Sequence, residues 1–128
     1  MSYYFHKKIK GYFDEVLQRT SAALATEGFG VLTEIDVQAT LKKKLNVDFR
    51  PYRILGACHP QSAYRALQQE DKIGLLLPCN LIVQEIESNL IEVAIIDPLQ
   101  AMQVAAQPAL IPLAQEITEK LHRVLEKI

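Results

Sequence analysis

The sequence lacks the local signatures that mark the common enzyme classes. It contains no Gly-rich phosphate-binding loop, no nucleophile elbow centred on serine and no His-Glu-x-x-His metal motif. Each of these motifs holds a reacting group or a cofactor in a defined backbone geometry. Their absence favours a protein that is not an enzyme, and the sequence points to no particular cofactor.

The sequence also lacks an excess of charge of either sign. Charged residues make up 23% of the 128 residues, and the formal net charge is −1 at pH 7. This balance provides no long-range attraction toward nucleic acid or acidic lipid. The basic run Lys42-Lys43-Lys44 has no aromatic or Arg-rich platform beside it, which is typical of a solvated helix face. We therefore expect no nucleic-acid partner.

Long hydrophobic runs are absent as well. The first residues lack the apolar stretch of about 7–15 residues that defines a secretory signal. No window approaches the roughly 20 apolar residues that span a membrane. We expect a cytoplasmic protein without a membrane partner, in which the two cysteines are reduced thiols rather than a structural disulfide.

The chain has the length and composition of one domain, residues 1–128. Hydrophobic residues make up 49% of it, enough to bury a core without disulfides or metal. Periodicity and turn residues predict strands over 3–10 and 29–35, a helix from Phe13 that ends at Gly28, and a short helix capped by Asp36. Toward the end they predict a hairpin over 81–96, a helix capped by Asp97, an interruption at Pro108 and a final amphipathic helix.

The middle of the chain holds two further apolar runs of strand length. Residues 52–58 predict a central strand, and the dipeptide His59-Pro60 predicts the start of a helix over about 60–69. Residues 73–77 form the next apolar run. The connection from His59 to Lys72 is 14 residues, about the minimum for a helical crossover between parallel strands, so we expect a βαβ unit here. The fold class predicted is α+β, with two layers and a mixed or antiparallel sheet that has helices packed on one face.

Both cysteines lie where an apolar run meets a proline turn. The segments are Arg53-Ile-Leu-Gly-Ala-Cys58-His59-Pro60 and Gly74-Leu-Leu-Leu-Pro78-Cys79-Asn80. Strand ends expose backbone donors and often bind ligands. We therefore predict a small-molecule binding site built from six residues at these strand ends: Cys58, His59, Pro60, Pro78, Cys79 and Asn80.

Two other functions fit the same residues. Cys58 before a helix start is a candidate nucleophile, because the helix dipole favours a thiolate, and Cys79 would be its resolving partner in a redox or sulfur-handling protein. Cys58, His59 and Cys79 also offer soft or borderline ligands for copper or zinc. That set is one ligand short of a four-coordinate zinc site, and only His6 or His122 remains to complete it.

Four segments together resemble the family called domain of unknown function 302: 28–36, 52–60, 74–79 and the dipeptide Asp97-Pro98. The resemblance implies a small α+β domain that associates as a homodimer. It implies no activity, since none is assigned to the family. Members often have Asn-Pro in place of His59-Pro60, and many lack one or both cysteines, so a thiol or imidazole mechanism is not implied for the family.

Overall fold

The computed structural model describes residues 2–128. The strands are β1 (Tyr4–Lys10), β2 (Gly30–Asp36), β3 (Tyr52–Cys58), β4 (Cys79–Glu87) and β5 (Leu90–Ile96). The α-helices are α1 (Phe13–Thr26), α2 (Val37–Leu45), α3 (Pro60–Gln69), α4 (Pro98–Met102) and α5 (Ile111–Glu126). Three 3₁₀ helices, η1 (Asp71–Leu76), η2 (Gln103–Ala105) and η3 (Pro108–Leu110), connect them.

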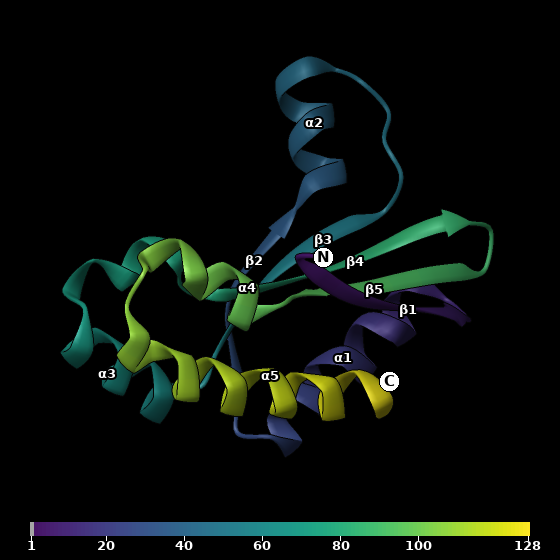
Figure 1. Ribbon diagram of the computed structural model, residues 1–128. Coiled ribbons are helices and arrows are strands. Elements are labelled where there is room, and N and C mark those ends of the chain that lie inside the picture. Colours follow the sequence, from purple (N-terminus) through teal and green to yellow (C-terminus); the bar gives the residue numbers. More distant parts are fainter. Residues whose placement is uncertain (1) are drawn as a thin grey trace.

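The strands form one sheet in the order β1-β5-β4-β3-β2, and every neighbouring pair is antiparallel. Helices α1 and α5 lie under one face of this sheet, whereas α2 stands away from it on the other side (Figure 1). Helices α3 and α4 lie at one end of the sheet (Figure 1). The predicted two-layer α+β fold is therefore confirmed, with an antiparallel sheet. Among residues 2–128, no helix is long and apolar enough to cross a membrane.

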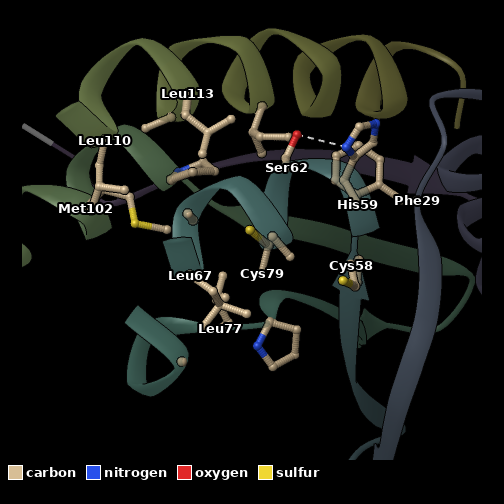
Figure 2. A pocket seen from close by; sticks show the side chains of 18 of the residues that line it. Phe29, Cys58, His59, Ser62, Leu67, Leu77, Cys79, Met102, Leu110 and Leu113 are labelled. Carbon is tan, nitrogen blue, oxygen red and sulfur yellow. Dashed lines mark hydrogen bonds between the residues drawn. The ribbon is translucent and has the colours of Figure 1, made fainter. Parts of the chain in front are cut away.

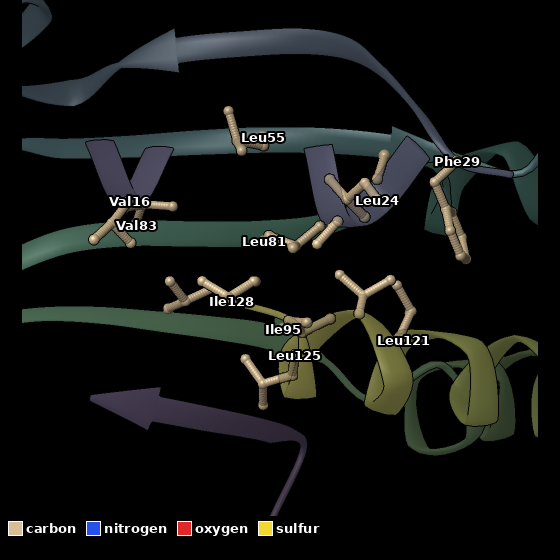
Figure 3. Packing of buried hydrophobic residues seen from close by; sticks show 14 of the residues in the cluster. Val16, Leu24, Phe29, Leu55, Leu81, Val83, Ile95, Leu121, Leu125 and Ile128 are labelled. Carbon is tan, nitrogen blue, oxygen red and sulfur yellow. The ribbon is translucent and has the colours of Figure 1, made fainter. Parts of the chain in front are cut away.

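The main core forms between the covered face of the sheet and helices α1 and α5 (Figure 3). The register places Leu55, Leu81 and Ile95 side by side in one row across three strands, and all three are fully buried. Burying one such side chain contributes about 1.5–3 kcal/mol. The apolar stripe predicted for the last helix completes this layer with its buried residues Ile117, Leu121 and Val124.

A second, smaller hydrophobic cluster lies beyond the end of the sheet. It contains residues of α3, η1, α4, η3 and the first turns of α5, namely Ala66, Ile73, Met102, Leu110, Leu113 and Ala114. Helix α5 therefore contributes its two halves to two different clusters. The helices around the second cluster pack mainly on one another and on α5, not on the sheet.

The predicted helix ends are confirmed. The Asp36 side chain accepts a hydrogen bond from the Ala39 N–H, and that of Asp97 accepts one from the Leu99 N–H. These bonds satisfy backbone donors that the first helical turn leaves unpaired. At the end of α1, Gly28 has a φ of +84°, and the Phe29 N–H donates to the Leu24 carbonyl, closing a left-handed C-cap. The predicted hairpin turn is also present, with Asn89 at a φ of +62°.

The predicted βαβ unit is wrong. Residues 71–76 form the 3₁₀ helix η1, and the strand that pairs with β3 is β4, which starts at Cys79 and runs antiparallel to β3. The apolar run 73–77 buries Ile73 in the second cluster instead of adding a strand. A short apolar run alone does not distinguish a buried strand from a buried helical turn. The two cysteines nevertheless lie at the same end of the sheet, because β3 ends where β4 begins.

Gly56 is required by the close approach of two neighbouring side chains. A Cβ at this position would lie 2.6 Å from Cγ of Pro78 and closer still to Oγ1 of Thr33. Pro78 follows the cis Leu77-Pro78 bond in the connection between η1 and β4. The absence of a side chain at Gly56 therefore lets this connection pack directly on β3.

We predict that Gly56→Ala destabilises the protein by about 1–3 kcal/mol, because the added methyl overlaps Thr33 and Pro78. Urea unfolding followed by circular dichroism measures the change. Gly30→Ala is the matched control on β2, since no atom lies within 4 Å of the position of its Cβ. We expect that control to remain within about 0.5 kcal/mol of wild type. Equal stability of the two variants would contradict the packing argument.

Candidate functional site

A cavity of about 340 Å³ lies between the end of the sheet and helices α3 and α5 (Figure 2). Its position follows from the two hydrophobic clusters. Phe29, Ala57 and Ile117 belong to the main core, Met102 and Leu113 belong to the second cluster, and all five line the cavity. The cavity is thus the space across which the two clusters face each other.

The lining is almost wholly apolar. Its nineteen residues include no Asp, Glu, Lys or Arg. Small residues occupy several positions where larger side chains would reduce the volume: Ala57, Ala63, Gly74, Ala66 and Ala114. On the rim, Leu32 is 68% exposed and Leu67 is 42% exposed. The cavity therefore opens to solvent past apolar side chains.

The two thiols both line this cavity, but they do not face each other in the sheet. Cys79 is the direct register partner of Ala57, so Cys58 lies one residue beyond the pair. Successive side chains of a strand point to opposite faces, and a disulfide needs Cβ atoms that point toward each other. Both cysteines are free thiols. This register does not favour a Cys58–Cys79 disulfide.

Burial controls the chemistry of Cys79. Desolvation, and to a lesser degree the neighbouring Cys58, raises the pKa of the Cys79 thiol to about 11. A thiol with this pKa is protonated at neutral pH, whereas nucleophilic attack needs the thiolate. In the cavity, Cys79 therefore acts as a small apolar wall.

His59 and Ser62 form the polar pair of the cavity. His59 is the N-cap residue of α3, and its Nδ1 lies 2.8 Å from Oγ of Ser62, one helical turn further on (Figure 2). Desolvation, followed by the nearby charge of Lys120, lowers the pKa of His59, while Glu116 acts in the opposite direction. The imidazole is therefore neutral at neutral pH.

The segment Gly28-Phe29 holds the His59 ring from the other side. The Phe29 and His59 rings meet edge to face with 5.4 Å between their centroids. A Cβ on Gly28 would lie 3.1 Å from Nε2 of His59. Gly28 thus serves twice, since its left-handed conformation ends α1 and its missing side chain makes room for the imidazole.

The three side chains considered as soft-metal ligands are not grouped around one point. Among residues 2–128, no three His, Cys, Asp or Glu side chains are placed to hold a metal ion, so Cys58, His59 and Cys79 do not form a ligand set. The histidines considered as a fourth ligand are engaged elsewhere. His6 lies on edge strand β1 with its Nδ1 2.7 Å from a Glu92 carboxylate oxygen, and His122 stacks on Phe5.

Of the six residues predicted to bind a ligand, four line the cavity: Cys58, His59, Pro78 and Cys79. Pro60 starts α3 and is exposed, and Asn80 is exposed on β4 opposite Gly56. Sequence reasoning missed Phe29, Ser62 and Met102 as residues of the site. One signal was available for Ser62, because a polar residue three positions after a helix N-cap faces back toward that cap.

Comparison with known proteins agrees with this architecture. The family model described as "Domain of unknown function DUF302" matches residues 5–128. A search of curated proteins finds no match. The crystal structure of an uncharacterized conserved protein DUF302 from Bacillus stearothermophilus superposes with a TM-score of 0.91 at 30% sequence identity, covering 99% of this chain and 98% of that one.

The fold and the cavity define a small two-layer α+β domain with an apolar hollow at the end of its antiparallel sheet. Within that class, the chain belongs to the DUF302 family, as the match over residues 5–128 shows. The resemblance found in the four sequence segments is thereby confirmed.

We predict that the Cys79 thiol reacts slowly with iodoacetamide. Raising its pKa from the ordinary value of 9.0 to about 11 lowers the thiolate fraction at pH 8 about 100-fold. The Cys58→Ala variant, which retains only this thiol, isolates the rate in a mass-spectrometric time course. The same variant in concentrated urea is the control, and there we expect the rate of a free cysteine. Equally fast labelling of the folded variant would show that Cys79 is not desolvated.

Proposed function

We propose that this protein is a non-catalytic binding module that takes an apolar small molecule into the cavity at the strand ends and works as a homodimer. The observation that supports binding is the cavity itself, about 340 Å³ in volume and without a charged side chain in its lining. Protein interiors are close-packed, and voids larger than a water molecule are few. A cavity of this size with an apolar lining is typical of a ligand site.

The volume supports a small ligand. An engineered cavity of about 150 Å³ lined by apolar side chains binds benzene. The cavity here is a little more than twice that size, which suits a molecule of two fused rings or a short branched chain. Sulfur atoms of Cys79 and Met102 in the lining also favour contact with aromatic rings.

The thiol-dependent alternative has less support. It needs a thiolate at one cysteine and a second cysteine that resolves the product. The register separates the side-chain directions of Cys58 and Cys79, and burial keeps the Cys79 thiol protonated. Neither feature assists thiol exchange.

Homodimerisation is supported by the part of the molecule that its own core leaves uncovered. Helix α2 has nine residues and none of them is buried. Isolated helices of this length are marginal in water, so α2 gains from contact with another surface. Beside it, Ile35 on β2 is 48% exposed and Leu45 on α2 is 65% exposed. In the register, Ile35 lies next to Ile54 on the sheet face opposite α1 and α5.

A second copy of the chain suits this surface, because the surface carries basic residues at one place and an acidic residue at another, and each can face the opposite charge on the other copy. Helix α2 carries Lys43 and Lys44 in its last turn, while the β4–β5 hairpin carries the exposed residue Glu87 next to its turn. A two-fold axis brings the same patch of both subunits together, which would set the basic helix of each against the acidic hairpin end of the other.

We predict that naphthalene binds the protein with a Kd tighter than about 1 mM, which corresponds to about −4.1 kcal/mol. Ligand-observed NMR titration measures this affinity. Ala114→Leu places a larger side chain in the cavity wall, and we expect at least a tenfold loss of binding. Ala39→Leu on exposed α2 is the matched control and should bind as wild type. Binding that is unchanged in Ala114→Leu would place the ligand outside the cavity.

We further predict that the protein sediments as a dimer at about 10 µM and that Ile35→Asp converts it to a monomer, because a carboxylate at the centre of the interface would be desolvated. Analytical ultracentrifugation gives the mass directly. Leu75→Asp is the control, since Leu75 is 86% exposed on η1 and η1 lies far from α2 (Figure 1). A wild-type monomer, or loss of the dimer only in the control, would reject this interface.

A further inference from the structure

We infer that the ligand is an uncharged molecule whose apolar body fills the cavity and whose one hydrogen-bonding group is met by Ser62 at the His59 end. This inference rests on the proposed binding function and specifies the chemistry of its ligand. It follows from three properties of the lining: the absence of charge, the single polar pair and the spare hydrogen-bonding capacity of that pair.

The first property excludes a charged ligand group inside the cavity. No acidic or basic side chain lines it, and burial keeps its thiol Cys79 protonated and its imidazole His59 neutral. The charged groups that act on His59 are Lys120 and Glu116 of α5, and neither lines the cavity. A carboxylate, phosphate or ammonium group would therefore lose its hydration without gaining an opposite charge.

The second property places the polar contact. The Ser62 residue is only 5% exposed, and its hydroxyl is held 2.8 Å from Nδ1 of His59 (Figure 2). In the close-up, this pair lies at one end of the cavity, away from Leu67 and Leu77 (Figure 2). A ligand group that reached Ser62 would thus lie deep, with the apolar body extending toward the rim.

The third property is the unused capacity of the serine hydroxyl. A hydroxyl offers one donor and two acceptor sites, and the bond with His59 uses one of them. Among residues 2–128, no other hydrogen bond of the Ser62 hydroxyl is found. When the hydroxyl donates to Nδ1, it can still accept a hydrogen bond from an alcohol or phenol; when an Nδ1–H donates to it, it can also donate to an alcohol, phenol or carbonyl group.

Three probes of one ring system test the inference: naphthalene, 2-naphthol and 2-naphthoate at pH 7. One added neutral hydrogen bond is expected to make 2-naphthol bind about threefold to tenfold tighter than naphthalene. The charged 2-naphthoate should bind at least tenfold more weakly than 2-naphthol. Competition in the NMR titration against naphthalene ranks all three at the same site.

Two variants assign the preference to the polar pair. In Ser62→Ala, the preference for 2-naphthol over naphthalene should disappear while the naphthalene affinity stays within about twofold of wild type. His59→Phe keeps a ring against Phe29 but removes the partner that orients the hydroxyl, and it should reduce the same preference. The naphthalene affinity of each variant shows that its cavity is intact.

Each result has one meaning. If naphthalene binds but 2-naphthol binds no more tightly, or if 2-naphthoate binds as well as 2-naphthol, the inference about the ligand is wrong and the cavity still binds. If the preference for 2-naphthol survives in Ser62→Ala, Ser62 is not the contact and the inference is wrong. If none of the probes binds, the proposed binding function itself fails.

Discussion

The fold depends on helix α5 serving two hydrophobic clusters at once. Its second half packs Ile117, Leu121 and Val124 onto the sheet, while Leu113 and Ala114 in its first half belong to the second cluster. A helix of sixteen residues is about 24 Å long, which is enough to bridge both. The cavity lies where the helix passes from one cluster to the other, so α5 contributes Leu113, Ala114 and Ile117 to its wall.

Ion pairs and a charged hydrogen bond at the surface join the elements that form the helical layer and the sheet. At the far end of α5, the Glu27 carboxylate lies within 3.0 Å of both Arg123 and Lys127, and hydrogen bonds from these two side chains lower the pKa of Glu27 to about 2. This joins the end of α1 to the end of α5. On β1, the Lys7 ammonium donates to the carbonyl of Ile128 over 2.9 Å. Full charges thus lie at the periphery of the layer, and none lines the cavity.

The elements that sequence reasoning predicted correctly depend on contacts between residues that are close in the chain. Asp36, Asp97 and Gly28 end or start helices through bonds with residues close in the chain, so their positions follow from residue type. The run 73–77 was misassigned because an apolar run indicates that a segment is buried but does not indicate whether that segment is a strand or a helical turn. For the site, Cys58, His59, Pro78 and Cys79 were found through the turns beside them, and Ser62 lies one helical turn after His59. Phe29 and Met102 come from distant segments with no shared motif.

Residue type and spacing along the chain are enough to predict the elements that depend on near neighbours: the helix caps, the hairpin and the amphipathic stripe of α5. Local hydrogen bonds and periodicity are sufficient for these. The antiparallel pairing of β4 with β3, and the cavity between the two hydrophobic clusters, arise when the whole chain is packed together. Volume and solvent exposure are properties of residues brought together from the whole chain, so no local pattern encodes them.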